Sequence, residues 1–455
     1  MPAPTLDFAD IQGLIVRPYA MGFFRLLLLR WMDAKSGRAL LGRLAPEITS
    51  AQPWTTKPAF CVNVGLSFAG LAALGMAKRS LSSFPDAFRA GVTGRADRIG
   101  DTGANAPEHW EPGLNDQDTH ALVIVFAQDP ATRDAQSARL TALLAPAGGG
   151  VSVVSAQNGD ASADHREHFG YRDGFSQPVI AGGGLEGQPE GGGDAPIAPG
   201  EFLLGLPDEL GVVPGSQPVP ASLAKNGSFV ALRKLHEDVA GFRHYLADNA
   251  ARLTDGDPEL LAAKMMGRWR SGAPLALAPT ADDPALAGDR AKNNAFNYKN
   301  DPRGFACPFG AHVRRVNPRD EAAHPARRHR LMRRGLPYGP PLLPPNTLVN
   351  DGVDRGVLLL MICADIERQF EFIQQVWINQ GIFVGLGRER DPIAGSHDDT
   401  LGMTINRFPI ARHAPALPRF VTTRGAGYFF LPGLSALRLL ASGRRATGRS
   451  TPAAA

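Results

Sequence analysis

The amino-acid sequence predicts a duplicated α+β sandwich, in which each of two similar halves covers a β-sheet with helices. Three observations lead to this prediction. The chain has 455 residues, more than one typical domain needs. Four times along it, an apolar strand-like run leads through an acidic residue into a helix-like segment. Two of these units lie on each side of a loop-rich middle, 181–225, that is dense in glycine and proline.

The four units share one organisation. Each begins with a run of large aliphatic or aromatic residues, which favours a buried strand, and continues with apolar residues at helical spacing. They lie at 23–46, 121–146, 228–250 and 356–378. Two units in each half resemble the ferredoxin-like βαββαβ arrangement, and its duplication creates a cleft between two lobes. The pattern alone leaves open the alternative of unrelated α/β segments.

The second unit shows why a helix follows its strand. Asp129 is a good N-cap, and Pro130 fits the first helical position, where its missing N–H has no role. Leu140 and Leu144 then lie on one helical face. In the fourth unit, apolar residues at i, i+3 and i+7 likewise predict a helix, namely Phe370, Ile373 and Trp377.

These elements predict four segments of chain. Residues 1–190 form an N-terminal ferredoxin-like lobe, and 191–225 form a loop-rich connection. Residues 226–445 form a C-terminal ferredoxin-like lobe, and 446–455 form a flexible tail.

Composition excludes several classes of protein. Charged residues make up 20% and the net charge is +4, which is too small over this length to indicate a nucleic-acid partner. Three widely spaced cysteines exclude a disulfide framework and a cysteine-based zinc site. The sequence has no apolar run long enough to cross a membrane and no Sec-type N-terminus. We therefore expect a cytoplasmic protein with no membrane partner.

His312 is singled out by its surroundings. It lies just before an arginine-rich stretch, 313–334, that contains eight arginines. Such a stretch is usually a solvated or nucleic-acid-binding face. This one lacks interleaved aromatic residues and is broken by prolines. It would equally suit a haem, with one imidazole for the iron and arginines for the two propionates.

A second motif is FGYRDGFSQP at 169–178. Gly170 and Gly174 bracket Asp173, and glycines allow positive φ and close approach of backbone to a flat ligand. Such a loop could direct the aspartate into a pocket. An ordinary Asp-Gly turn explains the same residues.

Together these motifs resemble the dye-decolourising peroxidases, a family of haem enzymes. The resemblance spans nearly the whole chain in the family's order, and the set is far more specific than any one motif. It consists of GYRDG at 170–174 as the GxxDG signature, the haem-ligand segment AHVRRVNPRD at 311–320, the distal-arginine segment HRLMRRGLPYG at 329–339, the later blocks 365–379 and 419–437, and the opening DIQGLIVRPY at 10–19.

The resemblance implies one haem b per chain and a fold of the dimeric α+β barrel type, with the haem between the sheet and the helices of the C-terminal lobe. It implies His312 as the iron ligand, Asp173 as the distal acid–base and Arg333 as the distal arginine. Gly174 and Phe175 would lie against the haem.

Three further assignments follow from the resemblance. Arg330 and Arg334 are the alternatives if the distal arginine is displaced by a few residues. Asp365 is the candidate acid that hydrogen-bonds the proximal imidazole. Leu358 and Leu359 would line the distal pocket, where Leu359 replaces a phenylalanine common in the family.

The activity implied is reduction of hydrogen peroxide with one-electron oxidation of dyes, phenols or similar aromatic reductants. Trp377 and Tyr338 are candidate electron relays by their place in the sequence, although core packing on its helix is the favoured explanation for Trp377. The alternatives are a non-catalytic haem-binding or iron-handling protein, and a nucleic-acid-binding protein that uses the arginines. A homo-oligomer is plausible because sheet edges are expected.

Overall fold

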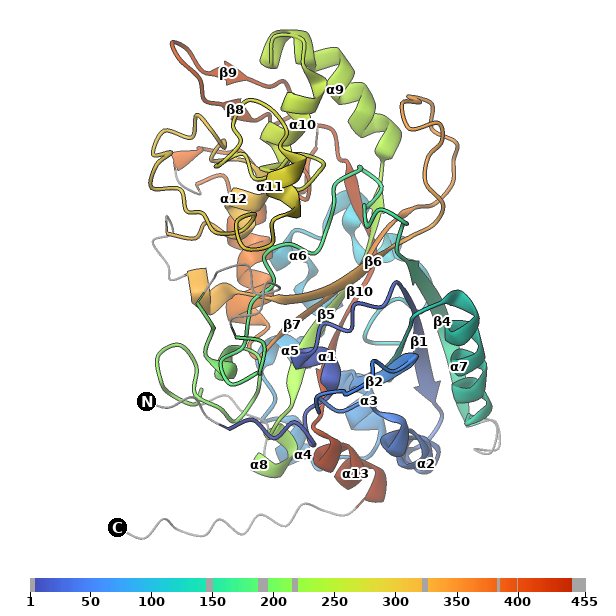
Figure 1. The fold of residues 1–455 in the computed structure, drawn as a ribbon. Coiled ribbons are helices and arrows are strands. Elements are labelled where there is room, and N and C mark those ends of the chain that lie inside the picture. The colour runs from blue at the N-terminus through green and yellow to red at the C-terminus, as the bar shows by residue number, and fades with distance from the viewer. Residues whose placement is uncertain are drawn as a thin grey trace.

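One eight-stranded antiparallel sheet runs through both halves of the chain (Figure 1). Its strand order is β4-β1-β3-β2-β10-β5-β7-β6, so the first-half strands lie together and join the second-half strands through β2 and β10. The strands are β1 (Phe23–Trp31), β2 (Phe60–Leu66), β3 (Ala121–Ala127), β4 (Val151–Asp160), β5 (Ser228–Glu237), β6 (Met332–Tyr338), β7 (Gly356–Cys363) and β10 (Val421–Leu431), and a separate hairpin consists of β8 (Thr404–Ile405) and β9 (Arg412–His413).

The computed structural model describes residues 5–144, 150–186, 195–214, 220–320, 326–382, 385–398 and 400–443. The predicted tail 446–455 and parts of the predicted connection 191–225 lie outside these residues. None of the helices in the described ranges is long and apolar enough to span a bilayer.

Helices cover the sheet at several places. The longer ones follow strands, and α13 from the end of the chain packs against α2 from its beginning (Figure 1). The helices are α1 (Gly13–Val16), α2 (Ala34–Leu44), α3 (Phe68–Ala73), α4 (Lys78–Leu81), α5 (Asp86–Ala90), α6 (Ala96–Ile99), α7 (Pro130–Ala142), α8 (Ala221–Ala224), α9 (Val239–Leu253), α10 (Pro258–Met266), α11 (Pro284–Gly288), α12 (His312–Val316) and α13 (Leu434–Ser442).

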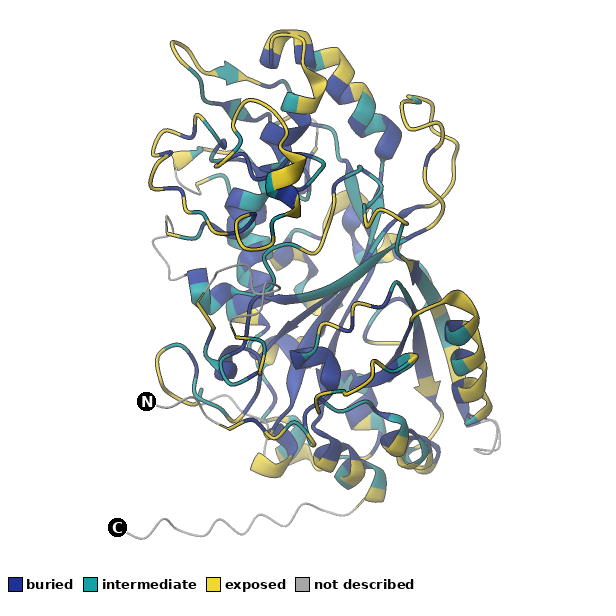
Figure 2. Ribbon diagram, in the orientation of Figure 1, coloured by how far each residue is buried: buried dark blue, intermediate teal, exposed yellow. Residues whose placement is uncertain are grey.

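The sheet has a core on each face, because side chains alternate along every strand. The inner core holds Leu26, Ile124 and Leu358, and the outer core holds Leu27, Val123 and Met361 beneath the helices. Its two edge strands approach each other, since Gly159 of β4 lies against Leu336 of β6, and this curls the sheet toward a barrel. Figure 2 shows the strands largely buried and the long loops above them largely exposed.

The predicted α+β fold is confirmed. The four units appear as β1 with α2, β3 with α7, β5 with α9, and β7 with a following helix. Asp129 caps α7 by accepting a hydrogen bond from the Thr132 backbone N–H at 2.8 Å.

The helix after β7 differs from the prediction. It consists of two π-helical segments, η9 (Glu367–Glu371) and η10 (Ile373–Ile378). The Glu371 N–H donates to the Ile366 carbonyl, five residues earlier, at 2.9 Å. A π-helix and an α-helix differ by less than one residue per turn, so apolar spacing over a dozen residues does not distinguish them.

Candidate functional site

His312 and Asp391, which are far apart in the sequence, pair through their side chains. His312 begins the short helix α12, and its Nδ1 lies 2.9 Å from Oδ2 of Asp391. The His312 side chain is 26% exposed, whereas that of Asp391 is fully buried. A carboxylate at Nδ1 fixes the tautomer with Nδ1 protonated, which leaves the lone pair of Nε2 to bind a metal.

Asp391 is held by more than the imidazole. Its Oδ1 accepts hydrogen bonds from the backbone N–H groups of Ile393 and Ala394, both at 2.9 Å. Burial opposes ionisation of this carboxyl, but His312, the backbone N–H groups and Arg315 together hold the pKa of Asp391 below its usual value. The carboxylate is thus charged and fixed in position.

Asp365 is not the acid at this imidazole, so that prediction is wrong. Its Oδ1 accepts the Arg368 backbone N–H at 3.0 Å, and its own N–H donates to Gln369 at 2.9 Å. Asp365 therefore starts the helix after β7. Asp391 lies 79 residues beyond His312, in a segment with no recognisable motif, and only the fold brings the two together.

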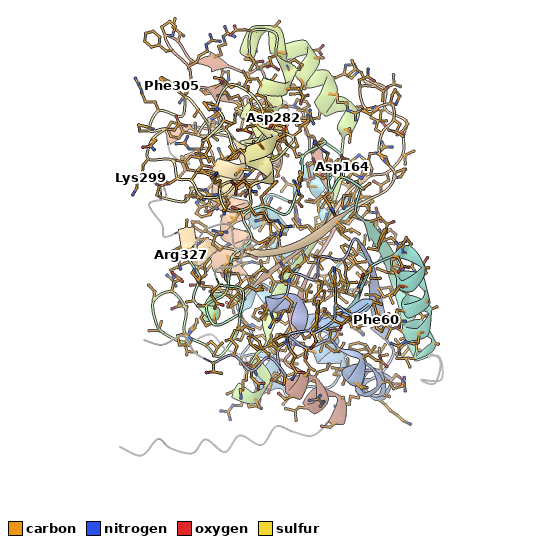
Figure 3. The ribbon with its side chains drawn as sticks, viewed as in Figure 1. Phe60, Asp164, Asp282, Lys299, Phe305 and Arg327 are labelled. Carbon is orange, nitrogen blue, oxygen red and sulfur yellow. The ribbon has the colours of Figure 1, made fainter. Side chains whose placement is uncertain are left out.

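The GYRDG segment forms a turn with Asp173 at its exposed end. Asp173 Oδ1 accepts the Gly174 N–H at 2.6 Å. Gly174 has φ +92°, and the position of a Cβ there is open. In Figure 3, Asp164, on the segment that leads into this turn, lies above the sheet.

Two arginines, Arg330 just before β6 and Arg333 within it, bind the residues that follow this turn. The Arg333 guanidinium donates to the Phe175 carbonyl at 2.8 Å, and that of Arg330 donates to the Ser176 carbonyl at 2.7 Å. Arg333 is thereby placed next to the segment that carries Asp173. Arg334 points the other way, into the barrel beside Tyr19, where burial lowers its pKa to about 10. Of the two alternatives to Arg333, the structure leaves only Arg330 near the turn.

The two leucines predicted for the distal pocket lie on opposite faces of β7. Leu358 is fully buried in the inner core, so its assignment to the pocket is wrong. Leu359 is partly buried on the outer face, which it shares with Arg333 across β6 and β7. Successive residues of a strand alternate between faces, which is why only one of two neighbours can line a site.

A group of arginines lies against Phe175. The Arg268 guanidinium is 5.0 Å from the centre of the Phe175 ring, and Arg319 lies 3.3 Å from Ser176 Oγ. Burial, together with the charges of Arg319 and Arg333, lowers the pKa of Arg268 to about 10. Positive charge is therefore concentrated here.

These residues fit a haem. Guanidinium groups are strong partners for carboxylates such as the two propionates, and a carboxylate-backed imidazole is a usual iron ligand. Half-buried apolar side chains accompany them from the same segments, including Val316 of α12, Leu386 and Ala394. The site thus offers one imidazole for the iron, several guanidinium groups for the propionates and apolar side chains for the ring.

Close packing links the turn to the helix of His312. A Cβ on Gly272 would meet the Phe175 ring at 2.2 Å, and one on Gly267 would meet Val313 of α12 at 3.1 Å. The short segment 267–272 therefore lies between the GYRDG turn and α12. It brings together two motifs that are about 140 residues apart in the sequence.

The arginines of the arginine-rich stretch are buried or half-buried. Arg314 and Arg315 are fully buried. Arg314 pairs with Asp301 at 2.8 Å, and Arg315 donates to the Trp377 carbonyl at 2.6 Å. In Figure 3, Arg327 lies at the edge of the molecule, but it pairs with Glu209 at 2.7 Å. These pairings argue against a nucleic-acid-binding face.

The two candidate relay residues are both buried. Trp377 is 3% exposed within the outer core, which confirms core packing, and Tyr338 is 7% exposed at the end of β6. The Tyr338 hydroxyl donates to Asp354 at 3.1 Å. Neither residue presents a surface at which a bulky reductant could be oxidised.

Comparison with known proteins identifies close resemblances. Residues 10–161 match the family described as the DyP dimeric alpha+beta barrel domain. The chain is 34% identical to Peroxidase 2 of Mycetinis scorodonius, over 95% of this chain and 87% of that protein. It is 30% identical to the Multifunctional dye peroxidase DyP2 of Amycolatopsis sp., over 96% of each. A solved dye-decolorizing peroxidase in complex with 2,6-dimethoxyphenol is 31% identical, with a TM-score of 0.82 over 96% of this chain and 100% of that one.

Proposed function

The chain belongs to the dye-decolourising (DyP-type) peroxidase family and is a haem-dependent peroxidase, and we propose that His312, Asp173 and Arg333 carry out its reaction. The single observation that supports this most is the His312–Asp391 pair at 2.9 Å, because it prepares one imidazole nitrogen for a metal. The tethering of the GYRDG turn to Arg333 supports the distal assignment.

Haem, when bound, supplies an iron centre that accepts the oxidising equivalents of peroxide and passes them on to reductants one at a time. His312 would hold the iron through Nε2, while Asp391 keeps the proton on Nδ1 and raises the basicity of the ring. Arg268 and Arg319 would neutralise the propionates. Gly174 and Phe175 would lie beside the ring, and Leu359 would keep water from it.

Asp173 would move the proton of hydrogen peroxide. Its carboxylate would take the proton from one oxygen of hydrogen peroxide and deliver it to the other oxygen, which can then leave as water. Oδ2 is the atom for this task, because Oδ1 is bonded to the Gly174 N–H. The Arg333 guanidinium would stabilise the negative charge that develops on the oxygens as the proton moves.

The reducing substrates would be dyes, phenols and similar small aromatic compounds. Relatives are named dye-decolorizing peroxidases, and one solved neighbour holds 2,6-dimethoxyphenol. Haem b is the form of haem proposed. The cytoplasmic location, the homo-oligomer and the division of the chain into four segments remain predictions from the sequence.

Replacement of His312 tests the iron ligand. We expect His312→Ala to abolish or greatly weaken haem retention, because no other group replaces the Nε2 lone pair. The ratio of haem to protein absorbance after purification and haem titration measures this. A variant with normal haem content and an unchanged spectrum would show that another residue is the ligand.

Replacement of the distal residues tests the peroxide step. Asp173→Asn and Arg333→Leu should retain haem but react with hydrogen peroxide at least about 100-fold more slowly, the lower range for general acid–base catalysis. Stopped-flow absorbance measures this rate. If Arg330→Leu is slow and Arg333→Leu is normal, the distal arginine is Arg330. If holoprotein with native Asp173 does not react, the chain binds haem without peroxidase turnover.

A further inference from the structure

Two glutamates lie behind the turn that carries Asp173, namely Glu167, which is half-buried, and Glu237, which is buried. Glu167 begins the turn, and Glu237 is the last residue of β5. Glu237 is 7% exposed, and its backbone N–H donates to the Arg355 carbonyl at 2.9 Å. The reaction proposed for His312, Asp173 and Arg333 uses neither of these two carboxyl groups.

Glu167 closes the turn through both its side chain and its backbone. Its Oε2 accepts the Phe169 N–H at 2.8 Å, and its Oε1 accepts the Tyr171 N–H at 2.6 Å. Its backbone N–H donates to the Tyr171 carbonyl at 3.0 Å, and its carbonyl accepts the Gly170 N–H at 2.9 Å. Asp173 follows two residues after this closed turn, so its position depends on the Glu167 carboxyl.

The Glu237 carboxyl lies within hydrogen-bonding reach of the Glu167 carboxyl. Among the described residues, no N–H or O–H group donates to the buried Oε2 of Glu237. Two carboxyl groups form a hydrogen bond only when one of them carries a proton. Two ionised carboxylates in a buried contact would repel strongly. A proton held between them satisfies both groups.

The electrostatic surroundings favour retention of that proton. Burial raises the pKa of Glu167 to about 7, and burial with the charge of Glu167 raises the pKa of Glu237 well above its usual value. Arg270 is a cation that faces the pair, but its Nε donates to Glu259 at 2.6 Å. The titratable or charged groups that face the pair are Asp173, Arg270, His168, Tyr171 and Tyr338.

We propose that Glu167 and Glu237 form a carboxyl pair that shares one proton, and that Glu237, as the proton donor, is a positioning residue for the turn from which Asp173 projects. The inference rests on the role proposed for Asp173. Loss of the shared proton leaves two adjacent carboxylates beside Asp173. Their repulsion weakens the grip of Glu167 on the Phe169 and Tyr171 N–H groups and displaces Asp173.

Infrared difference spectroscopy on the holoenzyme tests the shared proton. At pH 7, the spectrum of Glu237→Gln is subtracted from that of wild type, and the difference should show the carbonyl band of one protonated carboxyl. The same band should appear when the spectrum of Glu167→Gln is subtracted from that of wild type. In each variant an amide N–H replaces the proton, and the remaining glutamate is ionised. Glu259→Gln is the matched control, because Glu259 contacts Arg270 but not the pair, and it should retain the band. Equal bands in wild type and in both pair variants would overturn the inference.

The pH dependence of the reaction with hydrogen peroxide tests positioning. The wild-type rate should fall at alkaline pH as the pair loses its proton. Glu237→Gln cannot lose a proton there, and its amide still donates to Glu167. The fall in its rate at alkaline pH should therefore lie at least about one pH unit higher than in wild type. At a pH above the wild-type fall, Glu237→Gln should react with hydrogen peroxide about tenfold faster than wild type. Glu237→Leu lacks a donor and should be slow at every pH, so rescue by glutamine separates donation from mere packing.

Amide hydrogen exchange gives a readout that is independent of activity. Exchange at Phe169 and Tyr171 should be slow in wild type and Glu237→Gln and faster in Glu237→Leu. Coincident pH profiles and equal exchange in all three proteins would overturn the positioning role. The outcome for Asp173→Asn is separate: if that variant reacts normally with peroxide, the proposed role of Asp173 fails, whatever the infrared spectra show.

Discussion

The buried carboxylate of Asp391 binds two kinds of partner at once. Oδ2 faces His312 Nδ1, while Oδ1 accepts the N–H groups of Ile393 and Ala394. The backbone thus fixes the carboxylate, and the carboxylate fixes the ring. An asparagine would be similar in shape but could present only one oxygen.

We expect Asp391→Asn to weaken haem binding by about 10- to 100-fold, the usual cost of losing the partner of a ligating histidine. The asparagine oxygen would retain the two backbone N–H groups, which leaves its NH2 group facing Nδ1 of His312. That contact favours the tautomer protonated on Nε2, which has no lone pair for iron. Titration of apoprotein with haem measures the affinity. Asp365→Asn is the control, because Asp365 does not touch His312, and equal affinities for the two variants would contradict the assignment of Asp391.

At the scale of elements, an apolar strand that is followed by a capped helix could be predicted from the sequence. A strand that contains both charged and apolar residues could not. β3 (Ala121–Ala127) is buried at every position, and Asp129 caps the helix that follows it, so both elements follow from local sequence. β6 contains Arg333, Arg334 and Pro337, and it lies outside the four strand–helix units that the sequence predicts. It is a strand because it lies at the sheet edge, where proline is tolerated and an arginine can project from either face.

The site shows the same limit. The residues proposed as iron ligand, distal acid–base and distal arginine each lie in a short motif, so a resemblance between sequences could suggest them. Asp391 and Glu237 lie in segments without a motif, and they meet His312 and Glu167 only because the chain folds. Leu358 and Leu359 could not be separated without the register of β7, since neighbouring residues face opposite sides of the sheet.

At the scale of the whole molecule, the two halves of the chain share one sheet and one outer core, whereas the predicted boundaries divide them into two lobes. The sheet continues from β2 into β10, and α13, the last helix, packs on α2 of the first half (Figure 1). Leu437 of α13 is fully buried in the outer core together with Leu40 and Leu41 of α2. Residues of the segment 226–445 thus complete the core of the N-terminal lobe.

We expect Leu437→Ala to lower the free energy of unfolding by about 2–5 kcal/mol, because it removes a buried side chain and leaves a cavity. The loss should appear in both halves, since one outer core spans the strands of both. Hydrogen exchange followed by mass spectrometry should therefore show faster exchange of the most protected amides in β3 and in β5 alike. Arg438→Ala is the matched control, because the next residue of α13 is exposed and should change little. Faster exchange confined to the first half would show that the lobes unfold independently, contrary to the continuous sheet.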